Sequence, residues 1–306
     1  MNCSGGKKMG YLFAILSVGA GAAKGYCGKR TSGRVSGTAE AMLANTIRMC
    51  LCIVIGFVLL LLQGQVAQLK VDGLALLIMV GSGITTAAFV VSWLIAVKRS
   101  AYMLLDVFLM LGVLVPMLLC KWLFSEQISG SQWLGLGILL AAVFIMCSYN
   151  AGIKGKLTLR SLGLLLFCGI SNGLADFCQK SYTYLYPQGN AAVFNFYTYV
   201  ISGVFLAVCW WLFRKREGGP CRTVKETVFP IFGYVAVMAL CLFANTYFKV
   251  LAARELSATQ LFPFVQGVAI GTSTFMSAVF FKEKITPRCV FGLLLAFAGL
   301  LVMNLL

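Results

Sequence analysis

Apolar runs of about twenty residues, the length at which an α-helix crosses the hydrocarbon core of a bilayer, follow one another along the whole chain. Short polar breaks between the runs hold most of the charged side chains. The pattern predicts membrane-spanning helices over residues 10–28, 41–62, 73–97, 100–122, 131–149, 159–180, 191–213, 227–252, 257–281 and 287–305. We therefore expect an all-α integral membrane protein with ten transmembrane helices, joined by short connections.

Composition supports the same class. Of the 306 residues, 60% are hydrophobic and 11% are charged. A soluble domain carries about a quarter of charged residues, because its whole surface faces water. Twenty-five Lys and Arg with nine Asp and Glu cannot cover a globule of this size, so a soluble protein is excluded.

The net charge of +16 changes only the expected partners. Most basic residues stand at the ends of apolar runs, where they meet lipid head groups and set orientation, so we expect a bilayer and no nucleic acid. With ten spans, the odd-numbered connections carry most of the basic residues, which the positive-inside rule places in the cytoplasm, with both termini outside. Lys7 and Lys8 at the N-terminus oppose this, and the orientation stays open.

Several kinds of chemistry are excluded by what the sequence lacks. The chain has no His, and its 12 Cys form no C-x-x-C pair and no metal-ligand spacing. It has no G-x-x-x-x-G-K-(S/T) loop for a nucleotide. We expect no metal, no cofactor and no enzyme activity; a lipid-modifying enzyme would need acids or nucleophiles clustered at one interface, and the nine acids are scattered.

One segment occurs twice. Residues 280–303 read FFKEKITPRCVFGLLLAFAGLLVM, and residues 123–146 read LFSEQISGSQWLGLGILLAAVFIM. Glu126 matches Glu283 and Gly135 matches Gly292 at one offset, and YCGK at 26–29 echoes FCQK at 177–180. The matches predict two related units, residues 1–150 and 151–306. The N-terminal run resembles a signal peptide, but its partner in the repeat is the internal run 159–180, so we expect it to be retained.

Each predicted unit has five helices, an odd number, so the second unit must insert upside down relative to the first. An inverted repeat of this kind forms a site near the bilayer midplane that opens alternately to the two sides.

The recurring turn has a structural explanation. Ser129 and Thr286 are placed to cap the helices that follow, and Pro287 suits a first helical position. Gly135 and Gly292 allow close helix packing. Glu126 and Glu283 lie where a carboxylate stays hydrated at the membrane edge. For these four repeat-motif residues, Glu126, Gly135, Glu283 and Gly292, we favour a structural role over substrate contact.

At these residues the chain resembles the ten-helix EamA-type members of the drug/metabolite transporter superfamily. EKIT at 283–286 fits the family's turn, EQIS at 126–129 departs at the basic position, and Arg48 after Asn45 resembles an arginine often seen there. The resemblance implies a two-unit transporter fold, with cytoplasmic termini the commoner arrangement. Small four-helix relatives couple protons through a Glu on helix 1. Helix 1 here has Lys24 and no acid, so that role does not carry over.

Charged residues inside spans are functional candidates because they are costly in lipid. The deepest are Lys24, Arg48, Asp106, Asp176 and Lys249. For Asp106 we favour a cavity position. Asp176 either pairs with Lys180 one turn on or faces a cavity. Arg48 either snorkels or meets substrate, and Lys24 and Lys249 reach an interface or pair with an Asp across helices.

Uncharged polar residues form a second group, for which hydrogen bonds between helices are the more usual role. They are Asn45, Asn172, Asn195, Tyr197, Asn245, Gln260 and Gln266, with Trp93, Tyr197 and Tyr199 as possible aromatic walls. The substrate-binding set we predict is Lys24, Arg48, Asp106, Asp176, Asn45, Asn172, Tyr197, Asn245 and Gln260. Gly267 and Gly271 form a G-x-x-x-G, which predicts a close helix contact, between the two units as one option.

We expect a secondary transporter in the cell's inner (plasma) membrane that moves a small organic metabolite or drug-like compound by alternating access, as an exporter. Mixed charges in the spans favour a polar substrate with a carboxylate or amine, such as an amino acid. The protein would act as a monomer or homodimer. The alternative is a non-transporting receptor or assembly scaffold, which predicts no central cavity and buried charges paired with one another.

Overall fold

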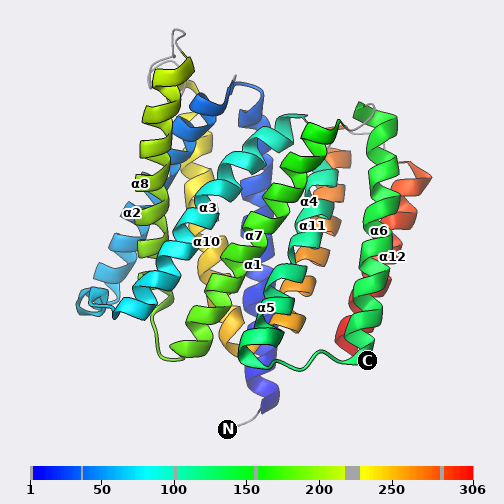
Figure 1. Cartoon of the computed structure of the whole chain (residues 1–306), viewed down its shortest axis with the longest axis horizontal. Helices are drawn as coiled ribbons and strands as arrows, with labels where there is room; N and C mark the ends of the chain where they lie inside the picture. Colours follow the sequence, from blue (N-terminus) through cyan, green and yellow to red (C-terminus); the bar gives the residue numbers. More distant parts are fainter. Residues whose placement is uncertain are drawn as a thin grey trace.

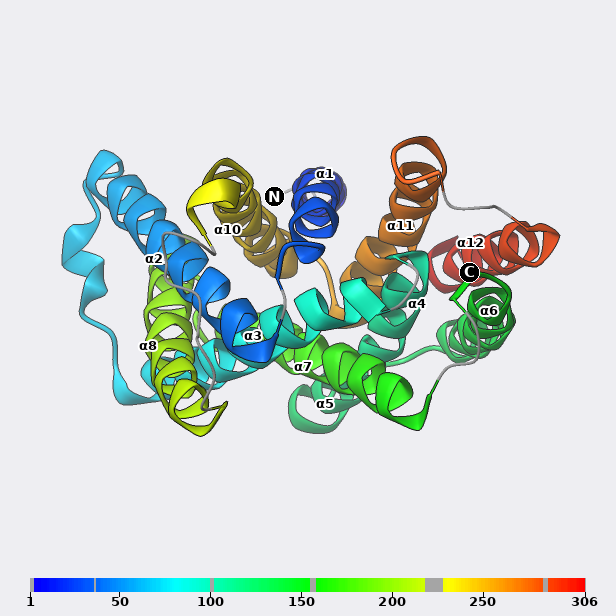
Figure 2. The ribbon, with the colours of Figure 1, turned by 90° about the horizontal axis from the view of Figure 1, so that it is seen from above.

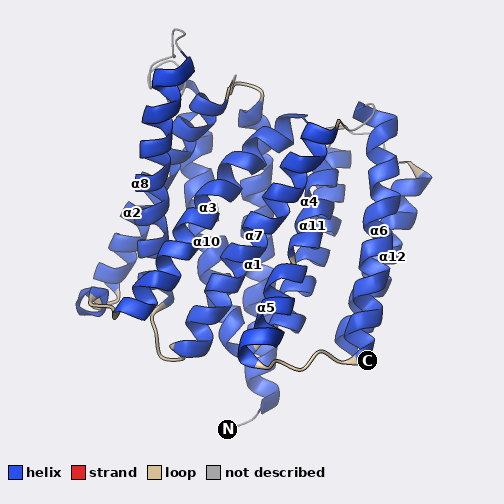
Figure 3. Ribbon diagram, in the orientation of Figure 1, coloured by secondary structure: helices blue, strands red, loops and turns tan. Residues whose placement is uncertain are grey.

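A computed structural model describes residues 3–35, 37–99, 102–154, 158–217, 228–282 and 286–305. Within them, secondary structure is helical throughout (Figure 3). The helices are α1 (Cys3–Ser32), α2 (Thr38–Leu62), α3 (Gly73–Arg99), α4 (Tyr102–Gly112), α5 (Leu114–Phe124), α6 (Gly130–Lys154), α7 (Leu159–Leu185), α8 (Ala191–Glu217), α10 (Phe232–Glu255), α11 (Ala258–Val279) and α12 (Pro287–Leu305). Two 3₁₀ turns, η1 (Val66–Leu69) and η2 (Phe229–Ile231), precede α3 and α10.

Every predicted run coincides with a helix, except that the run over 100–122 is divided into α4 and α5. The division follows from Pro116, which has no N–H for the carbonyl of Gly112 four residues earlier and whose ring would clash with it. Among the described residues, α2, α3, α7, α8, α10 and α11 are long and apolar enough to cross a membrane, and shorter apolar helices lie at 108–124, 130–142 and 290–303. The all-helical membrane fold is therefore confirmed, while the count of ten spans stays a prediction.

The helices form two facing rows with a pair at each end (Figures 1 and 2). One row contains α10, α1 and α11, and the other contains α3, α7 and the α4–α5 pair. At one end α2 packs on α8, and at the other α6 packs on α12. Both termini lie at the same end of the bundle (Figure 1). The space between the rows is where a site can form.

The two halves of the chain interleave in this arrangement. The main partners of each helix come from the other half: α1 packs on α10, α3 on α7, α2 on α8 and α6 on α12. By order along the chain, α1 corresponds to α7, α3 to α10, and α4–α5 to α11. If each helix is exchanged for its counterpart, the helices of one row become those of the other row, and the two end pairs stay the same. Neither half therefore buries its helices alone. The predicted boundary at residue 150 falls inside α6.

Glycines permit the closest crossings. On α7, Gly169 and Gly173 form a G-x-x-x-G, and a Cβ built at Gly169 would lie 2.5 Å from the carbonyl oxygen of Phe108 on α4. Sequence analysis missed this motif. At the predicted one, Gly271 packs against Phe297 of α12, with 3.0 Å from a built Cβ to the ring. That contact is close as predicted, but it lies within the second half.

The repeated turn has the expected local structure in its first copy. The backbone N–H of Ser129 donates to Gln132 at 3.0 Å, and the N–H of Gln132 donates to the Ser129 hydroxyl at 3.3 Å. This reciprocal pair is a capping box at the start of α6, so the predicted cap is confirmed. In the second copy α12 begins at Pro287. Gly292 is buried on α12, and Glu283 lies outside the described residues.

Glu126 joins the two halves at the membrane edge. Its carboxylate accepts a hydrogen bond from the N–H of Ala258 at 3.0 Å, at the start of α11, and lies 3.6 Å from the Lys180 ammonium. An anion at a helix N-terminus is favoured by the orphan N–H groups and the helix dipole there. The arrangement fits the structural role predicted for Glu126.

We predict that Gly135→Ala destabilises the protein by about 1–3 kcal/mol, since overpacking a tight contact costs that much. A Cβ at Gly135 would lie 2.6 Å from the backbone oxygen of Gly299 on α12, which cannot move aside as a side chain can. At Gly137, on the same helix, a Cβ meets nothing within 4 Å, so Gly137→Ala is the matched control. Thermal unfolding of the detergent-solubilised protein measures both; equal stability of the two variants would contradict the prediction.

Candidate functional site

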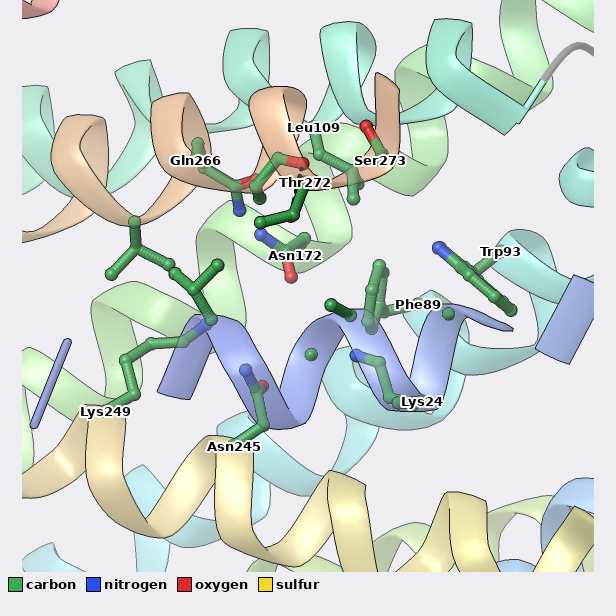
Figure 4. Close-up of a pocket in the computed structure, with 16 residues that line it drawn as sticks. Lys24, Phe89, Trp93, Leu109, Asn172, Asn245, Lys249, Gln266, Thr272 and Ser273 are labelled. Atoms are coloured by element: carbon green, nitrogen blue, oxygen red, sulfur yellow. Dashed lines mark hydrogen bonds between the residues drawn. The ribbon is translucent and has the colours of Figure 1, made fainter. Parts of the chain in front are cut away.

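A cavity lies between the two rows of helices, with an empty volume of about 570 Å³ that includes its mouth. It is lined from α1, α3, α4, α7, α10 and α11, so both halves contribute (Figure 4). Its polar lining consists of Lys24, Asn172, Asn245, Lys249, Gln266, Thr272 and Ser273, and its aromatic lining of Phe89 and Trp93. Polar groups concentrated in an otherwise apolar membrane domain indicate a place for a ligand.

A buried ion pair supports one end of the cavity. The Lys249 ammonium on α10 lies 2.7 Å from a carboxylate oxygen of Asp176 on α7, and both residues are almost fully buried. The amide of Asn172 donates to the second carboxylate oxygen at 3.3 Å. Lys249 and Asn172 line the cavity, whereas Asp176 does not appear in its lining. The carboxylate thus lies behind the ammonium and fixes it at the cavity wall.

The other end of the cavity is aromatic. The Lys24 ammonium on α1 lies 5.5 Å from the centre of the Phe89 ring on α3, within the range of a cation–π contact. Trp93 follows one turn later on α3 and packs so closely on α1 that a Cβ at Gly28 would collide with its ring. Figure 4 shows Phe89, Trp93 and Lys24 together, away from Lys249.

Most uncharged polar residues of the cavity already have partners. The Asn245 amide donates to the carbonyl oxygen of Ser17 at 2.7 Å and to its hydroxyl at 3.0 Å, which ties α10 to α1. Thr272 and Ser273 donate to carbonyls of their own helix. Gln266 is different: it is 6% exposed, and its amide has no hydrogen-bond partner among the described residues.

The predicted substrate-binding residues divide into three groups. Lys24, Asn172 and Asn245 line the cavity, and Asp176 contacts it through Lys249. The structure does not place Arg48, Asn45, Tyr197 or Gln260 in the lining. For Asp106 the structure describes only the backbone, in α4; its side chain lies outside the description.

Two alternatives from the sequence are settled by the contacts of Asp176. It pairs with Lys249 across helices, which was one predicted option, and not with Lys180. Lys180 points to the end of α10 and donates to the carbonyls of Ala253 at 2.9 Å and Leu256 at 2.7 Å. A cation at a helix C-terminus satisfies orphan carbonyls, so Lys180 is a structural residue.

Two of the predicted residues outside the cavity, Asn45 and Tyr197, make hydrogen bonds between elements. Asn45 donates to the carbonyls of Ala41 at 2.8 Å and Val90 at 3.3 Å, which joins α2 to α3. The Tyr197 hydroxyl donates to the carbonyl of Leu69 at 2.7 Å. Arg48 is 3% exposed beside a small separate cavity, so it does not snorkel to the membrane edge. Interhelical bonding, the usual role of such groups in membranes, accounts for Asn45 and Tyr197.

Sequence reasoning left Gln266, Thr272, Ser273 and Phe89 out of the predicted set. On α11 a signal was present: Gln266 and Ser273 are seven residues apart and so share one face of the helix, and Thr272 is next to Ser273. Lys249 was also outside the predicted set; it lines the cavity, and its partner Asp176 lies 73 residues away in sequence.

We predict that Lys249→Met destabilises the protein by about 3–5 kcal/mol, because it leaves the Asp176 carboxylate as an uncompensated buried charge. The double variant Asp176→Asn/Lys249→Gln removes both charges and should recover most of the loss. Lys70→Met, at an exposed lysine, is the control. Unfolding of the purified protein at pH 7 measures all three; a double variant as unstable as the single one would contradict this account.

Comparisons with known proteins bear on the family. One solved crystal structure is similar over 99% of this chain and 97% of its own, with a TM-score of 0.69 and 15% identity, which shows a shared fold alone. No curated protein matches the chain. Residues 159–305 match the EamA-like transporter family, whose members are generally transporters of small solutes. The resemblance seen in the sequence is confirmed by this match over the second half of the chain, since the EamA-like transporter family is part of the drug/metabolite transporter superfamily.

Proposed function

We propose that the protein is a secondary transporter that moves a small organic metabolite or drug-like compound across the cell's inner (plasma) membrane by alternating access, as an exporter. The observation that carries the proposal is the cavity between the two rows of helices, lined with polar groups from both halves. A polar cavity enclosed by membrane helices can bind a solute near the middle of the bilayer, where the solute is no longer surrounded by water.

The interleaved packing supports an alternating mechanism. Because exchanging counterpart helices turns one row into the other, a rearrangement that opens the cavity at one end has an equivalent that opens it at the other. The Glu126–Lys180–Ala258 contacts lie at the end where α7 finishes and α11 starts, and they hold the α5–α6 connection against the second half. We propose that the two halves are inverted repeats and that contacts of this kind change between the two states.

Energy for transport would come from an ion gradient or from exchange, since the sequence has no nucleotide-binding loop. Lys24, Lys249 and Asp176 at the cavity support a polar substrate that carries a carboxylate or an amine, such as an amino acid. We further propose that the protein works as a monomer or homodimer, and that it is not an enzyme.

One observation favours the alternative of a receptor or scaffold. The buried charges Asp176 and Lys249 are paired with each other, as a purely structural core would require. The polar cavity argues for a transporter, because a purely structural core has no need of a cavity lined with polar groups from both halves of the chain.

Metabolite profiling of cells and medium, with and without expression, tests the transporter. We expect at least one class of small organic compound to leave the expressing cells. Thr272→Trp places a large side chain in the cavity and should reduce that export by about tenfold or more, as expected when productive binding is blocked.

Phe275→Trp is the matched control, since this residue lies on the same helix but is 63% exposed on its outer face. It should leave export unchanged. If the inserted wild-type protein alters no compound, or if Thr272→Trp exports as well as the control, the receptor or scaffold reading replaces the transporter.

A further inference from the structure

At the end of the cavity near Lys249, two side chains, Lys249 and Gln266, can donate hydrogen bonds to a ligand. We propose that Lys249 and Gln266 bind a carboxylate group of the substrate, so that the transported compounds are small carboxylic acids whose apolar or aromatic body lies along Phe89 and Trp93. This inference rests on the proposed function and narrows it: the sequence left carboxylate and amine equally open.

Gln266 supplies the first argument. Its side chain is buried on α11 and lines the cavity, yet its amide makes no hydrogen bond with any described residue. Because this residue lines the cavity, its amide can donate to or accept from a ligand or a water molecule there. Asn245, which faces the same cavity, already uses its amide nitrogen to donate to the carbonyl and the hydroxyl of Ser17.

Lys249 supplies the charge. An ammonium has three donors, and the one contact that fixes it goes to Asp176 at 2.7 Å. Asp176 fixes the position of the Lys249 ammonium, and Lys249 lines the cavity. A carboxylate accepts charge-assisted hydrogen bonds from such a group, which are about twice as strong as neutral ones.

The positions of Lys249 and Asp176 relative to the cavity decide which charge a ligand should carry. Asp176 is 2% exposed and lies behind Lys249, so a ligand entering the cavity meets the ammonium first. A ligand amine would be placed against a like charge, whereas a carboxylate would be attracted and could also accept from the Gln266 amide. Figure 4 shows Lys249 and Gln266 on the same side of the cavity.

The opposite side fits the rest of such a molecule. Phe89 and Trp93 provide aromatic surface, and Val18, Leu109 and Val265 extend the apolar wall. A flat or branched apolar body is bound by contact with these side chains, and aromatic faces add specific geometry. The site therefore combines a carboxylate anchor with an apolar pocket.

A binding assay with compounds that differ only in their head group tests the proposal. The probes are 3-phenylpropionate, isovalerate and indole-3-acetate, each compared with its primary amide and with the amine of the same body. Thermal stabilisation of the purified full-length protein gives the affinities. We expect each acid to bind about tenfold or more tighter than its amide and its amine, the difference that one charge-assisted contact supplies.

Gln266→Leu and Gln266→Glu identify the anchor without disturbing the ion pair. Leu removes the amide and should weaken the acids by about tenfold, and Glu should weaken them further by like-charge repulsion while improving the amines. Gln127→Leu, the removal of an exposed amide on the α5–α6 connection, should change nothing. Amides or amines that bind as well as the acids, acids that do not bind, or affinities indifferent to Gln266 would each overturn the proposal.

Transport measured in parallel separates the two proposals. Export of compounds without a carboxylate would keep the transporter and remove the carboxylate site. Selective acid binding without any transport would keep the site and remove the transporter.

Discussion

Polar and charged groups inside a bilayer must find their partners within the protein, and this constraint organises the whole bundle. Backbone groups are satisfied by the helices themselves. The Asp176–Lys249 ion pair satisfies side chains between the two rows of helices, and the Asn245–Ser17 hydrogen bonds join α10 to α1 within one row, beside the cavity. Because these groups gather where the rows meet, that interface is also where a polar cavity can exist without exposing charge to lipid.

The bundle is also held together by close packing between the two halves of the chain. Hydrophobic attraction between helices is weak in lipid, so association depends on contact between well-fitted surfaces. Gly135 against Gly299 in the α6–α12 pair, and Gly169 with Gly173 against α4, bring backbones together where any larger residue would collide. Gly112, which packs against Gly169 of α7, is also the residue at which α4 ends. The close packing and the break between α4 and α5 therefore fall at the same place, beside the cavity.

Side chains of the same chemical type have different roles in this protein, according to where they lie in the bundle and which groups they contact. Lys180 and Glu126 lie at the membrane edge, where they satisfy the free ends of α10 and α11. Lys249 lies in the interior and faces the cavity. Gln266 and Asn245 are both buried amides, but only Asn245 is used to join helices. Residue type alone therefore says little about role in this fold; the available partners decide it.

The amino-acid sequence was enough to predict the membrane class, the positions of the helices, the capped turn at Ser129 and the family that residues 159–305 match. Each of these depends on residues that are close together in the chain: the length of an apolar run, a Ser three residues before a Gln, a short repeated motif. It also identified Lys24, Asn172 and Asn245 as inward-facing candidates, since polar groups in a span have few other places to go.

Only the tertiary structure decided which of these groups meet. The partner of Asp176 lies 73 residues away, the partner of Asn245 lies 228 residues away, and Arg48, Asn45, Tyr197 and Gln260 lie outside the cavity lining. These outcomes depend on how each helix is rotated and which neighbour it faces. Rotation is set by packing against helices from the other half of the chain, and no single apolar run contains that information.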